Sequence, residues 1–202
     1  MKQIAIPGEV IEKGNKRILS GAYKDGDEIK SMYVGVVYNN DLGVKVVPLG
    51  GRYEPRVGDV IIGHVTKDNP FIYEVEINSY KKAVLPKRTM DRITVNVGEI
   101  ILLKIISVNE VKDVDVEFMS KLYNGVLMNI SSKKIARVIG KAKSMLELIQ
   151  KYTETRLSIG ANGNIYVLGD NTERVRDVIN KIDEYSHVDN LTDKIEDYLK
   201  NN

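Results

Sequence analysis

One stretch decides the fold: Val57-Gly58-Asp59-Val60-Ile61-Ile62-Gly63-His64-Val65, which recurs in outline as Val97-Gly98-Glu99-Ile100-Ile101-Leu102-Leu103-Lys104-Ile105. In both copies a glycine turn leads into a run of β-branched and aliphatic residues, the composition of a half-buried strand. Residues 71–77 between them alternate in polarity. The apolar face of this alternation carries Phe71, Tyr73, Val75 and Ile77. With turn clusters at 67–70 and 78–82, these residues predict about five short strands in one small β-barrel.

Residues 4–56 also predict an all-β unit, because turn-forming residues recur about every 8 to 12 positions. Strands are expected at 4–6, 17–19, 31–38 and 44–47. A unit of about 50 residues buries little apolar surface by itself. We therefore expect it to pack against the barrel or against a partner protein.

The apolar pattern changes from strand to helix spacing after Leu122. A strand is expected at 123–130, followed by a short helix that breaks at Gly140. The apolar positions of this helix are Ile135, Val138 and Ile139. Ser144 and Glu147 have the spacing of a capping box, whose two side chains accept hydrogen bonds from amides at a helix start. The helix they begin has an apolar face of Met145, Leu148, Ile149 and Tyr152.

Two strands and a third helix follow. The strands are expected at 156–159 and 164–168, joined by Asn162-Gly163, a pair that favours the positive φ of a type I′ hairpin turn. The helix starts near 170–173 and buries Val175, Val178, Ile179 and Ile182. An amphipathic tail at 187–202 either packs on the body as a helix or frays. Its apolar residues are Leu191, Ile195, Tyr198 and Leu199.

The composition is that of an ordinary globular protein, with 43% hydrophobic and 29% charged residues among 202. This length suits two or three small domains. The absence of cysteine excludes disulfides, thiolate metal sites and thiol nucleophiles. No apolar run approaches the roughly 18 residues of a membrane span, and the first residues do not resemble a secretory leader. We therefore expect a cytoplasmic protein with no membrane partner.

Little in the sequence suggests catalysis. The two histidines, His64 and His187, lie in different segments without metal-ligand spacing. Asp113, Asp115 and Glu117 alternate with apolar residues, which indicates the solvated face of a strand rather than a metal cluster. No Walker loop or nucleophile elbow occurs. We therefore expect no catalytic residue, no metal and no cofactor.

Positive charge is concentrated between Phe118 and Leu146, although the net charge of the whole chain is only +2, from 30 basic and 28 acidic residues. That span has no acidic residue and contains Lys121, Lys133, Lys134, Arg137, Lys141 and Lys143. Affinity for nucleic acid depends largely on neutralising phosphates, so the span predicts RNA binding. The alternative is a basic helix face that contacts only solvent.

The predicted barrel mixes aromatic and basic side chains, a combination that stacks the bases of single-stranded RNA and contacts its phosphates. Tyr73 and Phe71 share a face with Val75 and Ile77, so core packing is the alternative for both. The basic residues of the barrel face either solvent or RNA. The candidate RNA-binding residues are taken from the barrel and from the basic span. They are Lys67, Tyr73, Tyr80, Lys81, Lys82, Lys87, Arg88, Arg137, Gly140, Lys141 and Lys143.

The barrel pattern resembles the S1 domain, an OB-fold module, and the order strand, helix, glycine loop, helix, strand, strand, helix resembles a KH domain. Gly140-Lys141-Ala142-Lys143 stands where a KH domain carries a Gly-x-x-Gly loop that clamps the RNA backbone. Lys143 replaces the second glycine, and its side chain obstructs the close approach that glycine permits. Its ammonium still attracts phosphate, so we expect non-specific backbone contact by Arg137, Lys141 and Lys143.

Three segments resemble the RNA-binding cap subunit of the archaeal exosome: Pro7-Gly8-Glu9, residues 21–26 and, most specifically, residues 47–59, Val-Pro-Leu-Gly-Gly-Arg-Tyr-Glu-Pro-Arg-Val-Gly-Asp. Residues 160–166 are similar to the Gly-x-Asn-Gly-x-Ile-Trp signature of that family, with Tyr166 in place of Trp. Turn chemistry favours a structural role for this segment. The resemblance implies a multidomain chain with an all-β N-terminal part and an α+β C-terminal part. Its domains would be an N-terminal β-domain (1–56), an S1-type OB barrel (57–121), a KH domain (122–186) and a helical tail (187–202).

The resemblance also implies a non-catalytic function. Cap subunits of this kind dock on a ring of RNase PH-like subunits, usually as a homotrimer, and guide the 3′ ends of single-stranded RNA into the ring for phosphorolytic decay. The residues expected to dock on the ring are Pro7, Gly8, Tyr23, Arg52 and Tyr53. One alternative is an S1 and KH accessory protein of translation, against which the segment 47–59 argues. A fragment of polynucleotide phosphorylase is the other, but that family has KH before S1.

Overall fold

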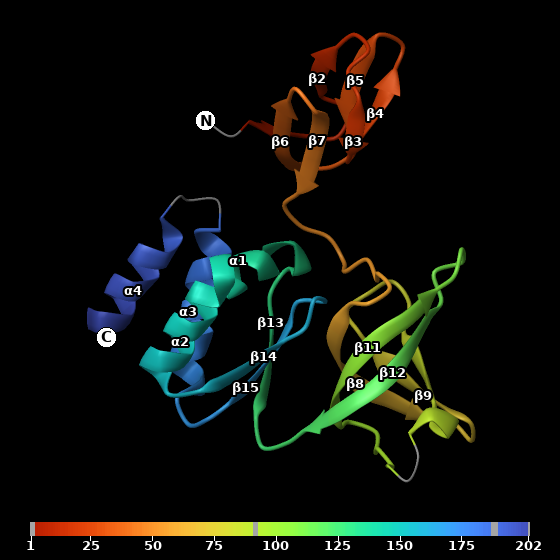
Figure 1. Cartoon of the computed structure of the whole chain (residues 1–202), viewed down its shortest axis with the longest axis vertical. Coiled ribbons are helices and arrows are strands. Elements are labelled where there is room, and N and C mark those ends of the chain that lie inside the picture. The colour runs from red at the N-terminus through yellow and green to blue at the C-terminus, as the bar shows by residue number, and fades with distance from the viewer. Residues whose placement is uncertain (1–2, 91–92, 187–189, 202) are drawn as a thin grey trace. The chain divides into compact units, whose positions relative to one another are not determined.

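The computed structural model describes residues 3–90, 93–186 and 190–201. Contacts divide the chain into two compact units, Met1–Gly51 and Arg52–Asn202, each described here by itself (Figure 1). His187 and the first residues of the expected tail, 187–189, lie outside the described residues. No helix in the described ranges has the length and apolarity needed to cross a membrane.

The first unit consists of two small sheets, with strand orders β1-β6-β7-β3 and β2-β5-β4. Its strands are β1 (Ile4–Ala5), β2 (Val10–Lys13), β3 (Ile18–Ser20), β4 (Ala22–Asp25), β5 (Glu28–Ser31), β6 (Gly35–Asn40) and β7 (Gly43–Pro48). The expected strand at 31–38 is wrong at its start, because Ser31 ends β5 and β6 begins at Gly35. The pattern did not indicate β2, β4 and β5, since charged residues interrupt their apolar alternation. The core is Ala5, Ala22, Ile29, Val37, Val44 and Val46.

The second unit begins with a closed five-stranded barrel of order β10-β12-β11-β8-β9, which confirms the barrel prediction. Its strands are β8 (Val60–Asp68), β9 (Ile72–Glu76), β10 (Ala83–Pro86), β11 (Ile100–Val108) and β12 (Val114–Leu122), with the 3-10 turn η1 (Lys87–Thr89) after β10. The glycine turns before β8 and β11 form as expected, with φ of 91° at Gly58 and 92° at Gly98. The pairing of β10 with β12 is parallel, with Ala83 opposite Val114, and the other pairings in the barrel are antiparallel.

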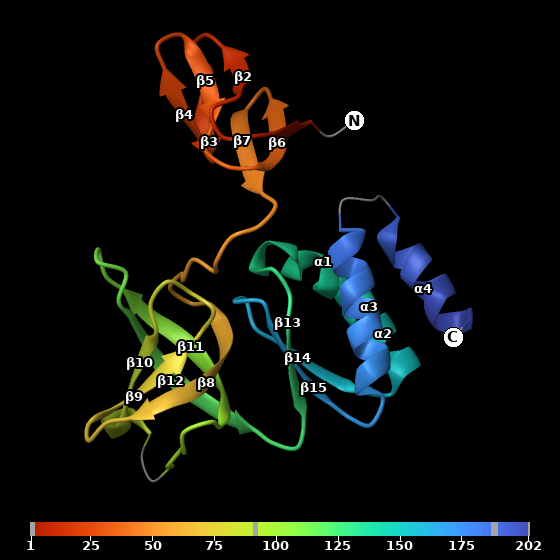
Figure 2. The ribbon, with the colours of Figure 1, turned by 180° about the vertical axis from the view of Figure 1, so that it is seen from behind.

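The rest of the second unit is a three-stranded antiparallel sheet of order β13-β15-β14 covered by helices. Its elements are β13 (Val126–Asn129), η2 (Ser132–Lys134), α1 (Ile135–Ile139), η3 (Lys141–Lys143), α2 (Ser144–Thr153), β14 (Arg156–Ile159), β15 (Asn164–Leu168), α3 (Thr172–Glu184) and α4 (Leu191–Asn201). The expected order and the four buried residues of α3 are confirmed. Figures 1 and 2 show this sheet between the helices and the barrel. The described part of the tail is helical, and α4 packs on α2 and α3.

Two local predictions are wrong. Lys143, not Ser144, is the N-cap residue of α2, and no side chain caps this helix. Because η3 runs directly into α2, Ser144 already has helical φ and ψ (−56°, −42°) instead of the extended backbone of an N-cap. The link between β14 and β15 is also not a type I′ turn, since Gly163 has a positive φ (91°) and Asn162 does not.

Candidate nucleic-acid interface

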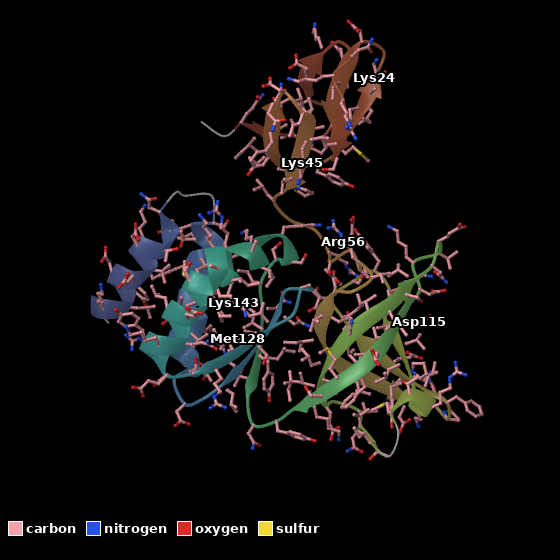
Figure 3. All side chains as sticks on the ribbon, viewed as in Figure 1. Lys24, Lys45, Arg56, Asp115, Met128 and Lys143 are labelled. Atoms are coloured by element: carbon pink, nitrogen blue, oxygen red, sulfur yellow. The ribbon has the colours of Figure 1, made fainter. Side chains whose placement is uncertain are left out.

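The lysine loop, residues 140–143, connects α1 to α2. Gly140 has φ 74°, and a Cβ there would lie 2.6 Å from the amide nitrogen of Met145, so only glycine fits. Ala142 and Lys143 also have positive φ, 50° and 66°. A left-handed backbone costs a non-glycine residue about 1–2 kcal/mol. The position of the second glycine in the expected Gly-x-x-Gly loop is therefore strained, and it is occupied by the exposed side chain of Lys143 (Figure 3).

The basic span does not act as one surface, because tertiary ion pairs neutralise part of it. Nζ of Lys121 lies 2.7 Å from a carboxylate oxygen of Glu99, and Nζ of Lys134 lies 2.8 Å from one of Asp183. The hydrogen bond between Lys121 and Glu99 lowers the pKa of Glu99 and raises the pKa of Lys121. In the described part of the chain, no carboxylate forms an ion pair with the remaining four cations, which are Lys133, Arg137, Lys141 and Lys143.

The candidate lysines of the barrel are paired with carboxylates. Glu74 holds two of them, Lys67 and Lys82, each at 3.6 Å. A hydrogen bond from Asn69 and the charges of both lysines lower the pKa of Glu74. The other pairs are Lys81 with Asp113 at 2.6 Å and Lys87 with Asp68 at 2.5 Å. Arg88, also a candidate, is exposed and makes no ion pair within the described ranges.

The aromatic candidates differ in burial. Tyr73 is only 3% exposed and belongs to the barrel core, where its hydroxyl accepts a hydrogen bond from the amide of Val95 at 3.4 Å. A ring so enclosed has no face for a base, so the stacking role expected of Tyr73 does not fit its position. Phe71 is 83% exposed, because β9 begins at Ile72 and the alternation does not extend back to it. Sequence reasoning left Phe71 out of the RNA-binding candidates, although its place directly after Pro70 signalled a turn.

The asparagine loop, residues 160–164, connects β14 to β15 and forms hydrogen bonds with the barrel. Nδ2 of Asn162 donates to the carbonyl oxygens of Ile62 and Ile77 at 2.7 and 3.0 Å, and its Oδ1 accepts from the amide of Ile62 at 3.2 Å. Asn164 also donates to the Ile62 carbonyl, at 2.6 Å. Asn162 is fully buried. Buried polar groups with complete hydrogen bonding fix one arrangement, so this loop has the structural role that was expected, through its contacts with the barrel rather than through a type I′ turn.

Comparisons with known proteins decide the family. No family model matches the chain. It is 33% identical to the exosome complex component Rrp4 of Picrophilus torridus over 98% of this chain and 93% of the relative. The Thermoplasma acidophilum protein of the same name is 34% identical, over 99% and 91% of the two chains. This chain belongs to the Rrp4 family.

A solved structure agrees with membership of the Rrp4 family. A crystal structure described as that of an exosome complex RNA-binding protein superimposes with a TM-score of 0.68 and 25% sequence identity. The match covers 75% of this chain and 97% of the other. Identity at this level over most of both chains supports a shared architecture.

The candidate docking residues of this Rrp4-family chain fall in both units. Pro7, Gly8 and Tyr23 are exposed on the first. Arg52 and Tyr53 belong to the second. Tyr53 is 5% exposed, and its hydroxyl is hydrogen-bonded to the carboxylate of Asp59. Its packing in the barrel core excludes it as a docking side chain, and burial together with that carboxylate raises the pKa of Tyr53.

Proposed function

We propose that this chain is a non-catalytic, RNA-binding subunit of an exosome. The observation that carries the proposal is the match to Rrp4 exosome components over 98% of the chain. Catalysis is assigned to partner subunits. The role of this chain is to hold single-stranded RNA and pass its 3′ end to them.

In this proposal the barrel is an S1 domain of the OB type at 57–121, and residues 122–186 form a KH domain. The strand order β8-β9-β10-β12-β11, closed by β11 on β8, supports the first assignment. Two helices joined by a glycine loop and packed on a three-stranded sheet support the second. The RNA-contacting residues are the lysine loop, Arg137, the barrel lysines, Arg88 and the exposed ring of Phe71.

The first unit is proposed to dock on a ring of RNase PH-like subunits, as one member of a trimeric cap. Its surface carries many exposed apolar side chains, which on a protein surface mark interaction sites. They are Ile4, Ile6, Val10, Leu19, Met32, Tyr33, Val34, Tyr38 and Leu42. The candidate residues Pro7, Gly8 and Tyr23 share this unit, whereas burial of Tyr53 argues against its use in docking.

The proposal is tested by purifying the tagged full chain from its own cells and identifying the co-purifying proteins. We expect RNase PH-like proteins, and an RNA-decay activity in the preparation that requires inorganic phosphate. The chain purified alone should bind RNA and leave it intact. Recovery of ribosomal proteins in place of RNase PH-like proteins would overturn the exosome assignment.

A further inference from the structure

A pocket of about 300 Å³ opens at one end of the barrel, and none of its lining residues belongs to the lysine loop. It is formed by three segments: the chain before β8, the β9–β10 connection and the β11–β12 connection. Its lining includes Tyr53, Pro55, Tyr80, Val108, Glu110 and Lys112. The volume is at the lower end of small-ligand sites, which suits one flat ring system better than an extended ligand.

The walls of the pocket are held by hydrogen bonds inside the unit. The amide of Tyr53 donates to the carbonyl of Asn78 at 3.1 Å, which fixes the first segment against the second. Asp113 accepts from Asn109 Nδ2 at 3.0 Å and forms the 2.6 Å ion pair with Lys81, which ties the third segment to the second. The three segments that frame the pocket are therefore held together in the free chain, which lowers the ordering cost of binding.

Tyr80 is the prominent side chain of the pocket. It is 70% exposed, and the Arg52 guanidinium carbon lies 5.4 Å from its ring centroid. Nη1 of Arg52 also donates to the Ser79 carbonyl at 3.3 Å, so the cation is held in place beside the ring. An exposed aromatic ring beside a fixed cation is a platform for stacking a base of single-stranded nucleic acid.

The charges around the pocket indicate which part of a nucleotide enters. Glu54 and Glu110 are among its lining residues, and carboxylates repel phosphate but accept hydrogen bonds from amino groups. Adenine, cytosine and guanine carry an exocyclic amino group with two N–H donors, whereas uracil has carbonyl oxygens and a single ring N–H between them. Lys112 is also among the lining residues, and its positive charge suits the phosphate that follows a captured base.

We propose that the Tyr80 pocket captures one base of single-stranded RNA, stacked on Tyr80, and that it selects bases with an exocyclic amino group over uracil. The inference rests on the proposed RNA-binding function and adds a base-selective site to it. In this proposal the lysine loop contacts the RNA phosphates without sequence preference, and base selectivity comes from the Tyr80 pocket.

The test compares the binding of the full chain to fluorescein-labelled 12-nucleotide oligo(A), oligo(C) and oligo(U) by anisotropy at fixed salt. We expect oligo(A) and oligo(C) to bind more tightly than oligo(U). Tyr80→Ala should weaken oligo(A) binding about tenfold, the loss of one stacked base, while Tyr80→Phe keeps it. Folding is not at risk because the ring is exposed. Tyr185→Ala, another exposed tyrosine of the same unit, is the matched control and should have no effect.

The paired substitution Glu54→Gln with Glu110→Gln separates stacking from selection. It should reduce the ratio of oligo(A) to oligo(U) affinity without weakening oligo(U). Tight RNA binding with no response to Tyr80→Ala would overturn the pocket and leave the RNA-binding function standing. Failure of the unmodified chain to bind any of the three oligonucleotides would overturn both.

Discussion

The lysine loop and the asparagine loop are both short glycine-containing turns of the second unit, yet they use their polar side chains in opposite ways. Asn162 is fully buried and all of its amide hydrogen bonds are made inside the chain. Lys141 and Lys143 are exposed, and their ammonium groups form no ion pair with any described carboxylate. Polar groups satisfied inside the molecule stabilise it, whereas groups without an internal partner are available to a ligand.

The largest expected effect is on stability, from Asn162→Ala. The substitution leaves the Ile62 amide and the Ile77 carbonyl buried without a partner, at a cost of about 1–3 kcal/mol each. We expect the free energy of unfolding, measured by urea titration, to fall by about 3 kcal/mol. Asn180→Ala, at an exposed position of α3, is the matched control and should change it by less than about 0.5 kcal/mol. A loss below about 1 kcal/mol at Asn162 would show that the barrel contact is not stabilising.

Alanine substitutions in the lysine loop should change the affinity for RNA rather than the stability of the fold. Lys141→Ala with Lys143→Ala removes two phosphate contacts, so the slope of log affinity against log salt should fall by roughly 1.4, or 0.7 for each contact to single-stranded RNA. The loss should be the same for every RNA sequence. Lys151→Ala with Lys194→Ala makes the same change in net charge at exposed positions on α2 and α4 and should leave the slope unchanged. An unchanged slope in the loop variant would remove the loop from the RNA site.

The two loops also show what a sequence can predict. Strands β14 and β15 and the apolar stripe of α3 follow from periodicity, because each depends on neighbours within a few residues. The partners of Asn162 at Ile62 are 100 positions away, and Lys81 and Asp113 are 32 apart. Charge counting located the basic span, but only the tertiary fold decides which of its cations are neutralised. The same fold places Tyr73 in the core and Phe71 on the surface.

Backbone strain in the lysine loop gives a smaller and opposite effect on stability. Lys143→Gly relieves a left-handed lysine, worth about 1–2 kcal/mol, against an entropic cost of glycine of about 0.5–1 kcal/mol. We expect a slightly higher free energy of unfolding together with a lower salt slope for RNA. Lys141→Gly is the matched control, because Lys141 has no positive φ and the substitution should destabilise. Equal destabilisation by both variants would show that Lys143 is not strained.

The smallest expected effect is on RNA affinity, from a substitution that leaves two paired lysines without their carboxylate. Glu74→Gln removes the charge that Lys67 and Lys82 share at 3.6 Å, and both then become available to phosphate. Exposed ion pairs are worth at most about 1 kcal/mol, so we expect RNA affinity to rise only about twofold, with a steeper salt dependence. Glu76→Gln, on the same strand and without a lysine partner in the described structure, should change neither quantity. If Glu74→Gln also changes neither, Lys67 and Lys82 do not lie on the RNA path, and their pairing with Glu74 is, like the hydrogen bonds of Asn162, a contact internal to the fold.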